Sequence, residues 1–147
     1  MPYGVVLVFV HGFRGRAEQT FGAYPERLRH LVRETHPGLR VEAVIYPTYE
    51  TRGVDALVAW LAALVAERES THGHRFRVVL CGHSMGGMVC LDAARAIRSQ
   101  GRGAWPCVGG VIAYDTPFLG IHPHVFKHQL TTYQQYVDSA FRASSMW

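Results

Sequence analysis

Four short runs of apolar residues constrain the fold of this chain more than any other feature. They cover residues 5–10, 41–46, 77–81 and 108–114, and β-branched residues are frequent in them. Within each run the apolar residues mostly do not alternate with polar ones, which is typical of strands covered by helices on both faces. Charged residues make up 18% of the chain, below the usual ~25%, in agreement with such buried strands.

Helical periodicity occupies the segments between and after these runs. It predicts helices beginning at Pro25, over residues 54–68, over residues 84–100 with a glycine cap at Gly101, and across residues 126–141. The residues from 70 to 74 are expected to form only a polar turn. Strands alternating with helices predict a parallel α/β sheet joined by right-handed crossovers. At 147 residues, the whole chain is expected to be a single domain.

The charge and cysteine patterns exclude several classes of protein. The net charge is +4 and the basic residues are scattered singly, so no stripe for nucleic acid is expected. Cys81, Cys90 and Cys107 form no C-x-x-C pair, and two of them lie in apolar stretches. We therefore expect free thiols and a cytoplasmic, reducing location. The run 5–10 is too short to span a membrane and lacks the flanks of a secretory signal.

The most informative segment is Gly82-His83-Ser84-Met85-Gly86, which follows a predicted strand and opens a predicted helix. This is the Gly-x-Ser-x-Gly pattern of a nucleophile elbow, in which the serine lies on a strained turn. The two glycines are expected because strand and helix approach too closely for Cβ atoms. A tight turn with an unused serine is the structural alternative. The sequence predicts Ser84 as a nucleophile.

A second element, His11-Gly12-Phe13, directly follows the first predicted strand. Acyl transfer needs two N–H donors that converge on the developing oxyanion. The backbone N–H groups of Phe13 and Met85 are the predicted donors. We expect His11 to be structural, bonded to nearby loop backbone, and His83 to pack away from the side of attack.

Four segments together carry a resemblance to a known family: residues 8–15, 45–51, 82–87 and 115–120. They resemble the α/β-hydrolase superfamily and, more closely, its lipase-like serine esterases. The last segment begins with Asp115, and in this respect the chain resembles an uncharacterised fungal-type subgroup of these esterases. The resemblance implies a doubly wound, mostly parallel sheet whose four strands lie in the order 2-1-3-4, with outer strands missing.

The resemblance also implies a catalytic triad in the chain order Ser, Asp or Glu, His, with the last two on loops after later strands. No further strand pattern follows residue 114. We therefore expect a chain that is incomplete at its C-terminus, and at its N-terminus because the oxyanion strand starts at once. The isolated chain is accordingly expected to lack the triad base and to be inactive.

An internal triad is the alternative. Asp115 is the tentative acid, since a minority of lipases carry it after the strand that follows the elbow, although residues 115–117 are equally typical of a turn. His122, His124 and His128 come next in the required order. His122 and His124 also have spacing for metal binding, but no third ligand lies nearby in sequence. We therefore expect these histidines to be solvated loop residues, and we expect the protein to bind no metal and no cofactor.

Two functions remain from the sequence. One is a serine esterase or lipase-like hydrolase acting on a small-molecule ester or a lipid. The other is a non-catalytic hydrolase-like domain that keeps the elbow for packing and binds a partner. If outer strands are missing, residues 41–46 and 108–114 form open sheet edges, and such edges pair with other chains. We therefore also expect self-association.

Overall fold

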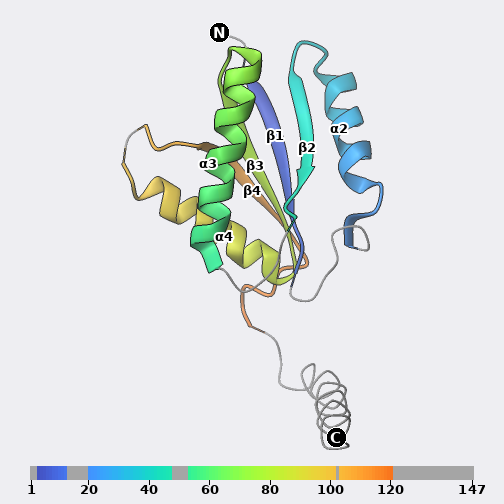
Figure 1. Ribbon diagram of the computed structural model, residues 1–147. Helices are drawn as coiled ribbons and strands as arrows, with labels where there is room; N and C mark the ends of the chain where they lie inside the picture. The colour runs from blue at the N-terminus through green and yellow to red at the C-terminus, as the bar shows by residue number, and fades with distance from the viewer. Residues whose placement is uncertain (1–2, 13–19, 48–52, 102, 121–147) are drawn as a thin grey trace, which may run out of the picture. The chain divides into compact units, whose positions relative to one another are not determined.

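The computed structural model describes residues 3–12, 20–47, 53–101 and 103–120 (Figure 1). The chain divides into two compact units, one up to Thr116 and one from Pro117 onward. All helices and strands below belong to the first unit. In the second unit, the Gly120 N–H donates to the Pro117 carbonyl at 3.0 Å. The helix predicted across residues 126–141 lies outside the described residues.

The first unit alternates strands and helices along the chain. Its elements are β1 (Gly4–Val10), α2 (Tyr24–Thr35), β2 (Arg40–Ile45), α3 (Gly53–His72), β3 (Phe76–His83), α4 (Met85–Arg98) and β4 (Cys107–Tyr114). The four strands are parallel and lie in the order β2-β1-β3-β4. The predicted fold class and strand order are confirmed. Each apolar run forms a strand, and helices cover the side chains of the central strands β1 and β3 most completely.

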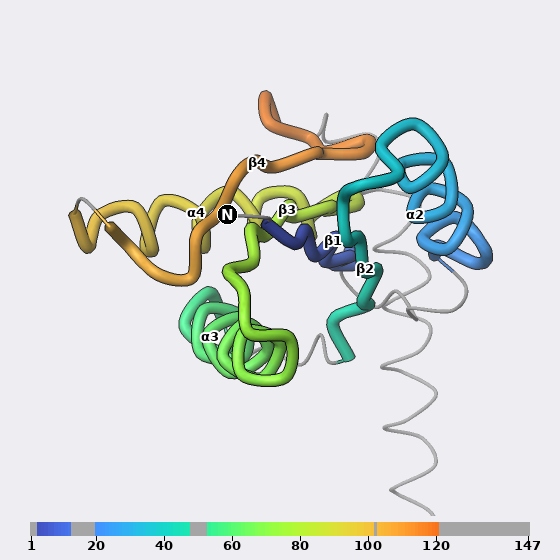
Figure 2. Tube along the Cα trace, turned by 90° about the horizontal axis from the view of Figure 1, so that it is seen from above, coloured from blue at the N-terminus to red at the C-terminus, as the bar shows by residue number. Residues whose placement is uncertain are grey.

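Helices cover both faces of the sheet (Figures 1 and 2). The chain steps from β1 to β2 in one direction through α2, and then back across β1 to β3 and on to β4 through α3 and α4. Right-handed crossovers in opposite directions place their helices on opposite faces. Accordingly, α2 packs against Leu7, Phe9 and Val41 on one face, and α3 and α4 enclose the larger core cluster on the other.

The carboxyl end of α3 differs from the prediction. The helix continues to His72, through residues expected to form a polar turn. Contacts from distant strands hold this last turn. Glu42 of β2 accepts a hydrogen bond from Arg68 at 2.7 Å, and its carboxylate lies 3.3 Å from His72 Nε2. The Phe76 N–H donates to the Glu69 carboxylate at 3.1 Å. These partners make a polar helix end stable.

The outermost strands of the described sheet are β2 and β4. β4 is covered less than the central strands, and Ile112 is 42% exposed. Its register against β3 shifts by one residue between Val78 and Val79, opposite the Gly109–Gly110 pair.

In the described part of the chain, no helix is long and apolar enough to cross a membrane.

Candidate active site

Ser84 occupies the junction between β3 and α4. Its backbone has φ 54° and ψ −128°, a combination that L-residues rarely adopt. The Ser84 N–H donates to the Tyr114 carbonyl at 2.8 Å, and the Ser84 carbonyl accepts from the Gly87 N–H at 3.1 Å. Bonds to β4 and to the first turn of α4 thus hold the strained residue from both sides. The turn itself is as the sequence predicted; the nucleophilic role stays a prediction.

The glycines flanking Ser84 permit the close approach of strand and helix. A Cβ atom on Gly82 would lie 2.5 Å from the Gly87 Cα and 2.6 Å from the Gly86 carbonyl oxygen. A Cβ atom on Gly86 would lie 2.7 Å from the His11 carbonyl oxygen. All three separations are shorter than the contacts that real Cβ atoms make. Any larger residue would push α4 away from the sheet and displace the serine.

The amino end of α4 offers hydrogen-bond donors beside Ser84. Met85 is the first helical residue, and the first turn of α4 holds no acidic residue. The early N–H groups of a helix lack intrahelical partners and carry the positive end of its dipole. The Met85 N–H is thus one of the free donors at the amino end of α4, and its role as an oxyanion donor stays a prediction. Phe13, the second predicted donor, lies outside the described residues.

The segment after β1 reaches Ser84 as the motif spacing requires. A Cβ atom on Gly12 would lie 3.0 Å from the Ser84 Cβ and 3.2 Å from the His83 carbonyl oxygen. The side chain of Ser84 therefore faces the backbone of Gly12. This contact follows from the direct pairing of β1 with β3, since the carboxyl ends of neighbouring parallel strands meet at the same edge of the sheet.

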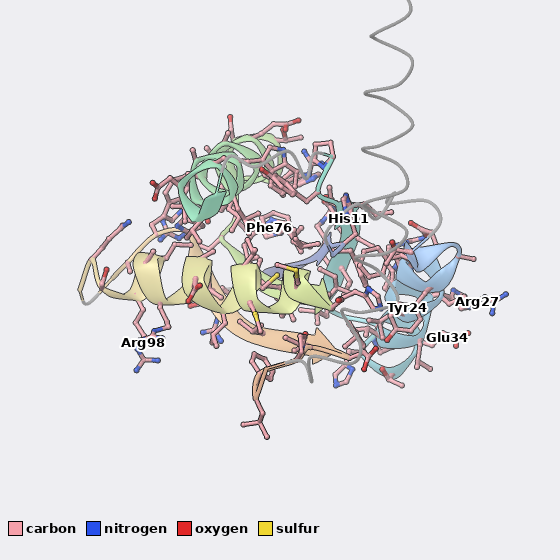
Figure 3. All side chains as sticks on the ribbon, turned by 90° about the horizontal axis from the view of Figure 1, so that it is seen from below. His11, Tyr24, Arg27, Glu34, Phe76 and Arg98 are labelled. Atoms are coloured by element: carbon pink, nitrogen blue, oxygen red, sulfur yellow. The ribbon has the colours of Figure 1, made fainter. Side chains whose placement is uncertain are left out.

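Two histidines adjoin the turn at Ser84 among the described residues, His11 at the end of β1 and His83 beside the serine, and both make structural contacts. His11 is only 5% exposed and lies among packed side chains (Figure 3), where its Nδ1 donates to the Gly12 carbonyl at 2.9 Å. The His83 ring packs edge-to-face on Phe21, with ring centroids 6.4 Å apart. Both arrangements agree with the predicted structural roles. His122, His124 and His128 lie outside the described residues.

Asp115 directly follows the residue whose carbonyl binds the Ser84 N–H. It has φ 49°, in the left-handed region, and its side chain is exposed at the carboxyl edge of the sheet. The structure therefore brings Asp115 to the same edge as Ser84. Its role as a triad acid is untested and stays a prediction.

Sequence reasoning missed the contact between Gly87 and Thr116. A Cβ atom on Gly87 would overlap the side chain of Thr116, whose hydroxyl also donates to the Tyr114 carbonyl at 3.5 Å. Thr116 thus packs directly on the first turn of α4. Gly87 could have indicated this contact in the sequence, because the Gly-x-Ser-x-Gly pattern ends at Gly86 and does not itself require a second glycine.

The thiol beneath the elbow is not a competing nucleophile. Burial raises the pKa of Cys81 to about 11, against a partial lowering by its hydrogen bond with Tyr114. Burial likewise raises the pKa of Cys90 to about 12. A thiol is nucleophilic only as its thiolate, so both remain inert near neutral pH. Burial also raises the pKa of Tyr114, whose hydroxyl lies 3.1 Å from that of Tyr24.

His72 and His74 lie two residues apart, a spacing that is also found in metal-binding pairs. Within the ranges that the structure describes, no three His, Cys, Asp or Glu side chains are grouped to hold a metal ion. The rings of His72 and His74 are tilted relative to each other, with centroids 5.9 Å apart. His74 Nδ1 donates to the His72 carbonyl at 2.9 Å, and His72 Nε2 faces Glu42. The contacts of this pair are those of a structural cluster.

Comparison with known proteins bears on the chain as a whole. Residues 7–144 match the family model described as "Alpha/beta hydrolase family". The matched range includes the strand before Gly12, the elbow at Ser84 and the segment at Asp115. No curated protein matches the chain. Because the matching family model spans nearly the whole sequence and the sheet order agrees with it, this chain belongs to the alpha/beta hydrolase family.

Proposed function

We propose that this hydrolase-family protein is a serine esterase of the lipase-like type, with Ser84 as its nucleophile. One observation carries the proposal: Ser84 is held at φ 54° between a buried strand and a helix N-terminus. Backbone strain of this kind persists where the surrounding structure enforces it, and it clusters at active sites. The segment 82–87 and the family membership support the same assignment.

The chemistry would proceed in two steps. The Ser84 hydroxyl oxygen attacks the ester carbonyl carbon while its proton passes to a base, and the carbonyl oxygen becomes an oxyanion. The Met85 N–H, together with that of Phe13, donates to this oxyanion. Collapse expels the alcohol, which takes the proton, and leaves an acyl group on Ser84. Water then attacks the acyl carbon and releases the acid. A small-molecule ester or a lipid is the proposed substrate class.

The identity of the base is the critical part of the proposal. A serine hydroxyl without an adjacent base is a weak nucleophile at neutral pH. His11 and His83 are engaged in packing contacts, so neither is proposed as the base. We propose that the described part of the chain provides the nucleophile and an oxyanion donor but no base, with Asp115 as the candidate acid. His122, His124 and His128 are the internal alternative.

Chemical rescue tests this arrangement directly. The chain is incubated with nitrophenyl acetate, with and without added imidazole, and acylation of Ser84 is followed by mass spectrometry. Imidazole should supply the missing base and raise the rate of acylation at Ser84 by at least tenfold. Ser84→Ala should abolish the signal, whereas Ser99→Ala, an exposed serine at the far end of α4, should leave it unchanged.

Two other outcomes are informative. Rapid labelling of Ser84 by a fluorophosphonate without imidazole, lost on replacing one of His122, His124 or His128 by alanine, would still support the hydrolase but place its base inside this chain. Absence of acylation at Ser84 under every condition would refute the esterase. The non-catalytic domain that binds a partner through the same fold would then be the better account.

The predicted location and self-association also remain proposals. Cys81 and Cys90 are buried free thiols, and unpaired cysteines are more frequent in reducing compartments. This supports a cytoplasmic location. The partly covered outer strand β4, with Ile112 exposed, supports pairing between copies of the chain. We propose a small-molecule ester or lipid, and not a nucleic acid, as the binding partner. The basic residues are scattered singly along the sequence, whereas nucleic-acid binding usually needs them gathered in a patch or stripe.

A further inference from the structure

A hollow lies at the opposite edge of the sheet from Ser84, where β1 and β2 begin. Its volume is about 540 Å³, within the range of small-molecule sites, roughly 300–1,000 Å³. It lies next to the loop between α2 and β2, at the end of the sheet drawn uppermost in Figure 1. The lining includes Tyr3, Arg29, Arg33, Leu39, Arg40 and His74.

The charge of this hollow is one-sided. Three of its nine lining residues are arginines, one is a histidine and none is acidic. Arg29 is paired with Glu26, Nη2 to carboxylate oxygen, at 2.8 Å. Among the described residues, neither Arg33 nor Arg40 has an ion-pair partner. Two guanidinium charges at the hollow are therefore uncompensated.

An aromatic ring, that of Tyr3, lines the hollow together with the arginines. Arg29 and Arg33 are one helical turn apart, so both lie on the same side of α2. Tyr3 is 48% exposed, and the guanidinium carbon of Arg77 lies 4.9 Å from its ring centroid. Arg77 thus adds a further positive charge beside the three arginines that line the hollow. Tyr3, Leu39 and Val41 provide apolar surface next to the arginines.

We propose that this hollow binds a small phosphorylated molecule, with its phosphate on Arg33 and Arg40 and its organic part against Tyr3 and Leu39. Guanidinium groups match the geometry of phosphate oxygens and bind them through two parallel hydrogen bonds. The volume exceeds that of a phosphate ion alone, so a phosphate monoester with a ring or a short chain fits best. The site is separate from Ser84 and independent of the esterase assignment.

Phenyl phosphate is a suitable probe because it combines a phosphate monoester with one aromatic ring. We expect saturable binding by isothermal titration calorimetry, competition by inorganic phosphate, and weakening at high salt. Arg33→Gln and Arg40→Gln should each weaken binding by roughly tenfold, the effect of losing one charge-assisted contact of about 1.4 kcal/mol or more. Arg27→Gln, an exposed arginine on the same helix outside the hollow, should change nothing.

A measurement on the unaltered chain keeps the proposal independent of variant folding. Amide chemical shifts in nuclear magnetic resonance should move on adding phenyl phosphate at Gly38, Leu39 and His74, and stay constant around Ser84. No saturable binding, shifts confined elsewhere, or equal losses in Arg27→Gln and Arg33→Gln would overturn the proposal.

Vesicles distinguish a soluble ligand from a lipid headgroup. Sedimentation with vesicles of phosphatidylcholine and phosphatidic acid should leave the chain in the supernatant, because the phosphate must enter the hollow with its organic part. Arg33-dependent sedimentation with these vesicles, without binding of phenyl phosphate, would overturn the small-molecule site in favour of a lipid headgroup.

Discussion

Replacing Ser84 by glycine should stabilise the protein while removing its proposed nucleophile. The residue is held at φ 54° and ψ −128°, and a sparsely populated conformation of this kind costs a non-glycine residue roughly 1–3 kcal/mol. Glycine adopts it without the Cβ penalty but loses more backbone entropy on folding, about 0.5–1 kcal/mol. The net gain for Ser84→Gly should therefore be about 0.5–2 kcal/mol.

Ser84→Ala is the matched control because it keeps the Cβ atom and removes only the hydroxyl. That hydroxyl makes no capping hydrogen bond to α4, so Ser84→Ala should lie within about 0.5 kcal/mol of the unaltered chain. The difference between the glycine and alanine variants then isolates the backbone strain. For a chain of this length, 1 kcal/mol corresponds to a shift in Tm of roughly 2–8 °C.

Urea unfolding followed by circular dichroism measures both variants under identical conditions. The m-values should agree, so that midpoints convert directly into free energies of unfolding. If Ser84→Gly is no more stable than Ser84→Ala, the turn stores no strain, and the main support for a functional elbow is lost. If both variants are more stable by the same amount, the hydroxyl rather than the backbone is responsible.

Other expected outcomes follow from packing, titration and the sheet edges. Gly86→Ala should destabilise by about 1–3 kcal/mol or more, because its Cβ would meet the carbonyls at the end of β1; Gly38→Ala, with open space around it, should lie within about 0.5 kcal/mol of the unaltered chain in the same urea assay. Iodoacetamide at neutral pH should modify the exposed Cys107 at least tenfold faster than Cys81 or Cys90; similar rates for all three thiols in mass spectrometry of digests would contradict the burial of Cys81 and Cys90. Because burial raises the pKa of Cys81 from 9.0 to about 11 and of Cys90 to about 12, the unfolded chain releases these protons first; the free energy of unfolding should fall as pH rises through 9 to 12, and a variant with both thiols replaced by alanine should fall less steeply. In sedimentation velocity the chain should self-associate with rising concentration through β2 or β4, and a single monomeric species at all concentrations would count against open edges.

The local sequence alone determined the elements and the turn at Ser84. Nearly continuous apolar runs have few alternatives to strands covered on both faces, and helical spacing between them indicates the crossovers. Gly82 predicted the close approach of β3 and α4, because the atoms that its Cβ would meet belong to Gly86 and Gly87, a few residues along the chain. The atoms that a Cβ on Gly86 would meet belong to the end of β1, so that contact also depends on the pairing of β1 with β3. The start of α4 at Met85 follows from the same local geometry, since the residue after the serine of the turn begins the helix; the donor role of Met85 remains proposed.

Contacts between distant segments were decided only by the tertiary structure. The last turn of α3 extends to His72 because Glu42 of β2 and the start of β3 provide its partners, and no local pattern encodes them. The bond from the Ser84 N–H to the Tyr114 carbonyl depends on the pairing of β3 with β4. The basic hollow likewise gathers residues from positions 3 to 74. Each arginine reads as an ordinary surface charge in sequence, and becomes part of a site only because parallel strands begin at the same edge of the sheet.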